Sequence, residues 1–291
     1  MKKNTIHIRF TQNLLPAVLF FIFSFLFSPA GAQKKQLVIL HTTDTHSQIF
    51  PISEQLPDTM KAGRGGFIRR IAMLKEERQK HPDLLYFDSG DFWQGSAYFT
   101  MFKGDAEIGL MNLMGIDAST LGNHEFDFGL DNLAEMLKKA NFPILCANYD
   151  FTGTPMEGIT KPWIIIKRNG VKIGVFAVCP RLEGLVSAKN CPGVKYSDPA
   201  QVALQTATML KQEKKCDMVV CISHLGWNSN RGHDDQYMIH GSRNIDLVLG
   251  GHTHTYMEEL MYENNMDGKP VPVDQNGKAA IFVGKLVVDL K

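Results

Sequence analysis

The sequence predicts an α/β fold built on a mostly parallel β-sheet core, with antiparallel hairpins added to it. Three observations support this class. Short apolar runs alternate with amphipathic helical patterns along the chain, which is typical of α/β proteins. Several of these runs are apolar throughout, as expected for strands that are buried on both faces. An Asn-Gly turn at residues 169–170 separates two β-rich runs and predicts a hairpin.

In chain order, the first predicted strand is the apolar run at residues 37–40, and Phe67, Ile71 and Leu74 then recur at helical spacing. Asp198 and Pro199 predict a helix start as N-cap and first helical residue. Residues 117–121 lead into a glycine, and hairpin strands are expected from residue 256, ending at residues 287–288. The other predicted strands are residues 84–87, 143–147, 163–167, 171–178, 218–222 and 245–249. The predicted helices are residues 66–80, 106–114, 130–140, 199–214 and 234–240.

Length and composition indicate an ordinary globular protein. The 291 residues are 44% apolar, which is enough to bury a large core, and the formal net charge is +1. Charges of both signs are mixed, with no block of like charge. This pattern predicts neither a nucleic-acid surface nor a polybasic membrane anchor.

Residues 1–32 have the pattern of a secretory signal peptide. Three basic residues precede a nearly continuous apolar run at residues 14–27, and Ala30 and Ala32 then form a small-residue cleavage site. The apolar run of 14 residues is shorter than the roughly 20 needed to cross a bilayer. We therefore expect cleavage before Gln33, export to the periplasm or the extracellular space, and no permanent membrane anchor. The remaining residues, 33–291, are expected to form one catalytic domain.

The chain has five cysteines, so at least one is unpaired unless it bridges to another chain. Cys179 and Cys191 flank a loop and could pair in an oxidising compartment. The positions of Cys146, Cys216 and Cys221 in or beside apolar runs are more typical of small buried hydrophobes. There is no C-x-x-C motif, so neither a zinc ribbon nor a thioredoxin-like site is supported.

Polar clusters follow five of the predicted strands. Ligands of α/β sheets bind at the carboxyl ends of strands, so these clusters can converge on one site. Each cluster alone has a structural explanation, such as a helix cap or a tight turn. Five such clusters, each after a predicted strand, are hard to explain as caps and turns alone. The clusters are Asp44-Thr45-His46, Asp91, Asn123-His124-Glu125-Phe126-Asp127, His224 and Gly251-His252-Thr253-His254.

The residue types in these clusters predict a metal centre. Aspartate, histidine and asparagine donors without thiolates suit Zn²⁺, Mn²⁺ or iron. Seven or more such ligands exceed what one catalytic ion normally takes from a protein, which predicts two ions, with Asp91 as the candidate bridge. Two-ion sites suit phosphoryl chemistry. Four other histidines lie in no such context and are interpreted as structural or surface residues: His7, His81, His233 and His240.

The same motifs resemble the calcineurin-like metallophosphoesterases, and in particular the catalytic domain of the secreted 5′-nucleotidase group. The resemblance covers about residues 37–290. The two stretches that point to the 5′-nucleotidase group are Gly122-Asn123-His124-Glu125-Phe126-Asp127-Phe128-Gly129 and the Gln94-Gly95-Ser96 that follows Asp91.

The resemblance implies a ligand set and a catalytic pair. One ion would be held by Asp44, His46, Asp91 and His254. The other would be held by Asp91, Asn123, His224 and His252. His124, paired with Asp127, would contact the phosphoryl group and stabilise the transition state. Asn123 and His124 would bind the substrate, and a metal-bound water would be the nucleophile.

We expect this chain to lack one feature of the group. Full-length members carry a second, C-terminal domain that binds the nucleoside, and we expect it to be absent here. Either a separate chain supplies that domain or the protein acts alone with loose specificity. The favoured function is hydrolysis of nucleoside 5′-monophosphates. The alternatives are a phosphodiesterase, a nucleotide-sugar pyrophosphatase or a sulfur-compound hydrolase on the same scaffold, and a binding subunit without turnover.

Overall fold

The computed structural model describes residues 2–6, 35–229 and 232–290. Of the predicted signal segment, only Lys2–Ile6 are described, as the edge strand β1. The apolar run and the predicted cleavage site lie outside the described residues, so the signal peptide stays a prediction. None of the helices in the described ranges is long and apolar enough to span a membrane.

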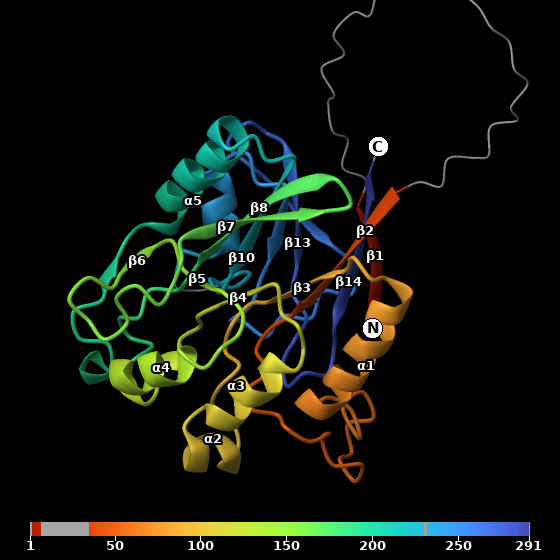
Figure 1. Cartoon of the computed structure of the whole chain (residues 1–291), viewed down its shortest axis with the longest axis vertical. Helices are drawn as coiled ribbons and strands as arrows, with labels where there is room; N and C mark the ends of the chain where they lie inside the picture. Colours follow the sequence, from red (N-terminus) through yellow and green to blue (C-terminus); the bar gives the residue numbers. More distant parts are fainter. Residues whose placement is uncertain (1, 7–34, 230–231, 291) are drawn as a thin grey trace, which may run out of the picture.

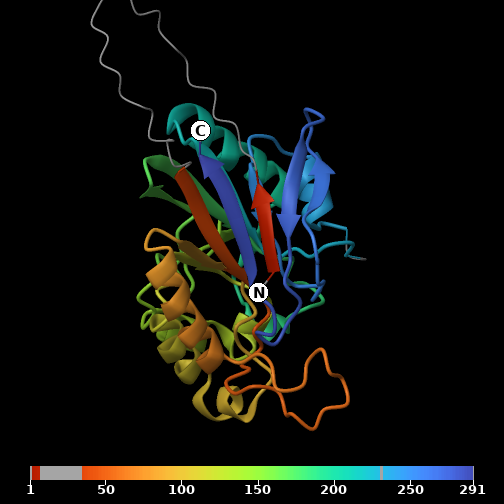
Figure 2. The same cartoon turned by 90° about the vertical axis from the view of Figure 1, so that its right-hand side faces the viewer.

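Two six-stranded sheets form the centre of the fold (Figure 1). The first has the order β1-β14-β2-β3-β4-β5. Strands β2 to β5 are parallel to one another, and β14 pairs antiparallel with β2 (Figure 2). Besides β1, its strands are β2 (Lys35–Thr42), β3 (Leu85–Asp88), β4 (Ala118–Thr120), β5 (Ile144–Leu145) and β14 (Gly284–Leu290).

The second sheet has the order β12-β13-β11-β10-β8-β7. Its central four strands are parallel, and the edge strands β7 and β12 pair antiparallel with their neighbours. Its strands are β7 (Trp163–Arg168), β8 (Val171–Val178), β10 (Met218–Ser223), β11 (Leu247–Leu249), β12 (Met261–Asn264) and β13 (Pro270–Asp274). A small third sheet pairs β6 (Tyr149–Asp150) with β9 (Lys195–Tyr196).

Helices cover the outer faces of the two sheets, with α1, α3 and α4 on one side and α5 on the other (Figure 1). The α-helices are α1 (Phe67–Lys80), α2 (Ala97–Phe102), α3 (Asp105–Asn112), α4 (Gly129–Leu137), α5 (Pro199–Thr208) and α6 (Asp235–His240). A π-helical segment, Met209–Glu213, follows α5. This α/β sandwich with mainly parallel sheets confirms the predicted fold class.

Burial on both faces explains the continuously apolar strands. In β2, Leu37 and Ile39 pack into the core between the two sheets. Val38 and Leu40 face the other way, into the core beneath α1 to α4. Successive side chains of a strand point to opposite faces, so a strand between two hydrophobic layers needs an apolar residue at every position.

The C-terminal tail differs from the prediction. Strands β12 and β13 form the expected hairpin, but β14 leaves it and joins the first sheet beside β2. There Leu286 and Val288 are fully buried between the sheets, which a strand in an exposed hairpin would not achieve. Strand β5 is also shorter than expected, because Ala147 already donates its backbone N–H to Ala177 of the second sheet (2.8 Å).

All five cysteines are free thiols in the structure. The Sγ atom of Cys179 lies 3.4 Å from that of Cys146, and Cys191 donates to the carbonyl of Ser187. Burial raises the pKa of the Cys146 and Cys221 thiols well above the usual value.

Thiol reactivity should therefore be confined to Cys191, which is the only one of the five that is not buried. In the reduced native protein we expect one thiol to react with an aromatic disulfide reagent at least about tenfold faster than the rest, since exposure and thiolate content control the rate. Cys191→Ser should abolish this fast phase, and Cys216→Ser should leave it unchanged. Two or more fast thiols would contradict the observed burial.

Candidate metal centre

The five predicted clusters lie in loops that leave the carboxyl ends of β2, β3, β4, β10 and β11. Strands of both sheets contribute, so the site lies at one end of the sandwich. The loops are linked directly: Asp44 donates its backbone N–H to Gly90 (3.0 Å), and His46 donates to Asp91 (2.9 Å). The expected convergence of these clusters is confirmed by the structure.

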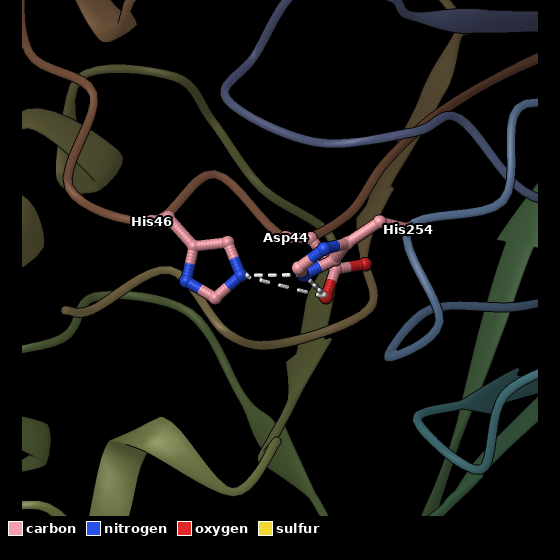
Figure 3. A group of neighbouring side chains, drawn as sticks. All are labelled: Asp44, His46 and His254. Atoms are coloured by element: carbon pink, nitrogen blue, oxygen red, sulfur yellow. Dashed lines mark hydrogen bonds and ion pairs between the residues drawn. The ribbon is translucent and has the colours of Figure 1, made fainter. Parts of the chain in front are cut away.

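The first donor group consists of Asp44, His46 and His254, whose side chains point toward one another (Figure 3). The Nε2 atoms of His46 and His254 are 2.8 Å apart. Oδ1 of Asp44 lies 3.9 Å from Nε2 of His46 and 3.5 Å from Nε2 of His254. One cation could bind all three atoms.

The second donor group consists of Asp91, His224 and His252. Oδ2 of Asp91 lies 3.1 Å from Nε2 of His224, and the same oxygen lies 4.0 Å from Nε2 of His46 in the first group. Asp91 is thus within reach of both groups, as a bridging carboxylate requires. The ligand roles of all these residues remain predictions.

Backbone strain is concentrated at this site. Five predicted ligands have a positive φ, which is uncommon for residues other than glycine. Such conformations persist only where the surroundings enforce them, and they cluster at functional sites. The five are Asp44 (48°), His46 (48°), Asp91 (51°), His252 (77°) and His254 (55°).

Orphaned polar atoms fit bound cations. Nε2 of His224 and Oδ1 of Asn123 are buried and make no hydrogen bond in the described part of the chain. Oδ2 of Asp91, which lies 3.1 Å from Nε2 of His224, is itself a predicted ligand. Burying a polar atom without a hydrogen bond costs free energy. Gly122 keeps this space open, because a Cβ there would clash with Oδ1 of Asp91 and would lie 2.6 Å from Nε2 of His224. Carboxylate, imidazole and amide donors arranged in this way suit divalent transition metals.

The electrostatics of the site also favour cations. Burial lowers the pKa of His224, but the carboxylates of Asp91 and Asp44 outweigh burial and raise it to about 10. Burial raises the pKa of Asp44 to about 7, with a contribution from the Asp91 charge. Burial also raises the pKa of Asp91, but the charge of His224 outweighs burial and lowers it below its usual range. A divalent ion would offer these buried carboxylates the same compensation as the positive charge of His224.

His124 and Asp127 lie at the rim of the donor groups. Nδ1 of His124 and Oδ2 of Asp127 are 2.9 Å apart, and about a third of each side chain is exposed. The ring centroids of His124 and His46 are 5.3 Å apart. Burial lowers the pKa of His124, but the hydrogen bond to Asp127 and the charge of Asp91 outweigh it and raise the pKa above its usual value. The pair can therefore present a positive charge beside the donor groups.

Glu125 is a site residue that the sequence did not reveal. It is fully buried, and each of its carboxylate oxygens accepts two backbone N–H groups. Oε2 accepts from Gly122 (2.6 Å) and Asp91 (3.0 Å), and Oε1 accepts from Phe92 (3.0 Å) and Trp93 (3.3 Å). Glu125 therefore holds two ligand-bearing loops together. In the sequence, Glu125 looks like one more acidic residue of the motif, and nothing there shows that it binds backbone N–H groups.

Replacing Glu125 with Gln should weaken metal binding. Whichever way the amide is turned, its NH₂ group faces two backbone N–H donors, so the loops that carry Asp91 and Asn123 must move. We expect the affinity for Zn²⁺ to fall about 10- to 100-fold, as for other groups that orient ligands. Competition with a chromophoric chelator measures this. Glu135→Gln, which removes an exposed charge on α4, is the control, and equal affinities for both variants would refute the role of Glu125.

His41 was also missed. It is fully buried between the sheets, with Nδ1 3.1 Å from Oδ2 of Asp274 and Nε2 2.9 Å from Oγ of Ser89. Ser89 Oγ donates its proton to Leu249, so it accepts from His41. The carbonyl of Ser89 accepts a hydrogen bond from Nδ1 of His224, which leaves Nε2 facing the carboxylates. The available signal was a lone histidine at the end of an otherwise apolar strand.

Donors of this kind at one end of an α/β sandwich, with a histidine–aspartate pair beside them, are typical of metal-dependent phosphoester hydrolases. The comparison with known families agrees. The chain belongs to the calcineurin-like phosphoesterase family, whose model matches residues 37–256. Members of that family use divalent metal ions, and this chain would hold them at the two donor groups described above.

The most informative relatives are 5′-nucleotidases. The 5′-nucleotidase of Bos taurus is 31% identical over 267 residues, which cover 89% of this chain and 44% of the relative. The snake venom 5′-nucleotidase of Gloydius brevicauda is 32% identical over 271 residues, covering 87% and 45%. The solved 5′-nucleotidase precursor from Thermus thermophilus superposes with a TM-score of 0.79 at 28% identity, covering 88% of this chain and 52% of that one. The chain spans about half the length of these relatives.

Proposed function

We propose that this protein hydrolyses phosphate monoesters, most effectively nucleoside 5′-monophosphates, with two divalent ions that are Zn²⁺ or Mn²⁺. The support for the reaction is the donor set together with the His124–Asp127 pair. The support for the substrate class is the similarity to 5′-nucleotidases at about 30% identity. The roles of the nine predicted site residues are part of this proposal.

The observation that carries the proposal is the position of His124. Its ring lies beside that of His46 in the first donor group, while its Nδ1 is held by Asp127. Nδ1 is engaged in this way, so Nε2 is left to donate toward a phosphoryl oxygen. A cationic donor that is fixed before the reaction stabilises charge as it develops, without reorganisation.

Divalent ions, when bound, supply an activated water and neutralise phosphoryl oxygens. The residues of the chain do the remaining work. Asp91 belongs to one donor group and reaches the other, so it fixes their separation. Asn123 and His124 orient the phosphoryl group, and Glu125 holds the loops that carry these residues together. No side-chain nucleophile is required.

Export and a partner are further parts of the proposal. Export rests on the signal-like pattern of residues 1–32. The matched region is less than half the length of the relatives, which supports a further domain in them. That a separate chain supplies such a substrate-binding domain here is part of this proposal. Adding a candidate partner to the purified protein should then lower KM for the nucleotide without changing its metal content.

A substrate panel tests the function. AMP, UDP-glucose, a cyclic nucleotide and a sulfur ester are offered with Mn²⁺ or Zn²⁺, and chelated protein is the control. We expect AMP to have the highest kcat/KM and chelation to abolish its hydrolysis. A preference for UDP-glucose or the cyclic nucleotide would replace the monoesterase proposal with a pyrophosphatase or a phosphodiesterase. No turnover of any substrate would favour a binding subunit.

A further inference from the structure

Two buried thiols lie side by side where the two sheets meet. The Sγ atom of Cys179 is 3.4 Å from that of Cys146, and both side chains are buried. Cys146 directly follows β5, an edge strand of the first sheet, and Cys179 directly follows β8 in the second sheet. The proposed function makes no use of either residue, so the contact between them needs an explanation of its own.

The backbones beside this pair are held together independently of the sulfur atoms. Ala147 donates its backbone N–H to the carbonyl of Ala177 (2.8 Å). The side-chain amide of Asn148 donates to the carbonyl of Cys179 and accepts its backbone N–H, both at 2.8 Å. Hydrogen-bonded strands lie about 4.8 Å apart, and the Cα atoms of a disulfide are about 4.4–6.8 Å apart. The two chain segments are therefore close enough for a disulfide.

Closing the bond would need only a small movement of the side chains. A disulfide is about 2.05 Å long, so the two Sγ atoms, now 3.4 Å apart, would have to approach by about 1.4 Å. Rotations about the Cα–Cβ bonds can supply this. Within the described ranges, Cys191 and Cys221 donate to backbone carbonyls and make no hydrogen bond to another thiol.

We propose that Cys146 and Cys179 form a disulfide in an oxidising compartment, and that this bond fastens the edge of the first sheet to the second sheet. The proposal concerns a modification of the protein and holds whether or not AMP is the substrate. It agrees with the proposed export, since disulfides form and persist outside the cytoplasm. It replaces the pairing of Cys179 with Cys191 that the sequence had left open.

The bond would form by two thiol–disulfide exchanges with an oxidant that is itself a disulfide. The thiolate of one cysteine attacks a sulfur of the oxidant, a mixed disulfide forms, and one oxidant thiolate leaves. The second cysteine loses its proton and attacks the protein sulfur of the mixed disulfide, which releases the other oxidant thiolate. Both departing thiolates take up protons, so two protein thiols are oxidised and one disulfide is reduced. Because both cysteines are buried, these steps require an opened chain, during folding or partial unfolding.

The location of the bond predicts what it would stabilise. The two cysteines are 33 residues apart, so the bond would close a loop that contains the β7–β8 hairpin and would restrict the unfolded chain. Val178, next to Cys179, accepts the backbone N–H of the predicted ligand His224 (3.0 Å). Oγ1 of Thr120, at the end of β4, lies 3.4 Å from the Sγ atom of Cys179. The bond would thus hold the ends of β4, β5 and β8 together beside the metal centre.

Mapping of the thiols tests the pairing directly. The purified protein is incubated with reduced and oxidised glutathione in urea at the midpoint of its unfolding transition, where every thiol is reached, and the urea is then removed. Free thiols are blocked with N-ethylmaleimide, and the protein is digested without reduction for mass spectrometry. We expect a peptide that joins Cys146 to Cys179 as the main cross-link. Recovery of both residues as blocked thiols or glutathione adducts, or a bond from Cys179 to Cys191, would overturn the proposal.

Thermal unfolding tests the stabilising role. We expect the Tm of the oxidised, metal-loaded protein to fall by about 5–10 °C when a phosphine reduces it. The Tm of Cys146→Ala should be the same with and without reductant, and Cys179→Ala answers the question if Cys146→Ala does not fold. Cys221→Ala, which removes a fully buried thiol outside the pair, is the matched control and should keep the redox-dependent fall. An unchanged Tm in the reduced wild type, or a redox-dependent Tm in Cys146→Ala, would refute this role.

Discussion

Asp91→Ala is expected to lose both metal ions and at least about a thousandfold in kcat/KM, because one carboxylate serves both donor groups. Oδ2 of Asp91 lies 3.1 Å from His224 and 4.0 Å from His46, and Oδ1 accepts the backbone N–H of His124 (2.9 Å). Removing the side chain therefore takes a ligand from each ion and a support from the catalytic loop. Oδ1 of Asp44 also lies within reach of both groups, at 3.9 Å from Nε2 of His224, but Asp91 is the closer carboxylate to His224.

The measurement for Asp91→Ala is metal content by mass spectrometry together with AMP turnover. Asp131→Ala, which removes an exposed carboxylate of α4, is the control and should retain both ions. Circular dichroism should show a folded variant, since the removed side chain belongs to a polar cluster and not to a hydrophobic core. Two ions retained in the variant would show that Asp91 is not a bridge.

His124→Ala is expected to separate chemistry from metal binding. The variant should keep two ions and lose about 10²- to 10⁴-fold in kcat, the range for a positioned acid–base or charge-stabilising group. Because about a third of the His124 side chain is exposed, its removal should disturb folding little. Asp127→Asn should reduce kcat less, because it weakens the hold on His124 without removing it.

The matched control for His124 is His240, which forms a comparable histidine–carboxylate pair with Glu263 (2.8 Å) away from the donor groups. His240→Ala should leave kcat and metal content unchanged. His124 also lies near His46 and Asp91 in a potential ligand group of its own. If His124→Ala lost an ion, His124 would be a ligand, and its assignment as a purely catalytic residue would be wrong.

Local patterns were enough to predict much of the fold. The run at residues 37–40 is apolar at every position because β2 lies between two hydrophobic layers, and the Asn-Gly turn sets the hairpin of β7 and β8. The position of β14 was not predictable in the same way. It pairs with β2, far away in the sequence, and neither strand carries a local signal that names its partner.

In the site, too, the residues with a local sequence signal were predictable, and those that act through long-range contacts were not. Clusters of metal-ligand residue types at five strand ends are hard to explain structurally when taken together, so Asp44, His224 and His252 were recognisable as members of that set. Glu125 and His41 act through backbone N–H groups and other side chains, and those contacts exist only after loops from different strands have met.

The central claim is that this chain binds two divalent ions at the donor groups. Elemental analysis of protein purified without chelators, at known concentration and from a tag that binds no metal, tests it most directly. We expect about two transition-metal ions per chain, falling to near zero in Asp91→Ala. The wild-type protein binding no metal, even after incubation with Zn²⁺ or Mn²⁺, would contradict the account.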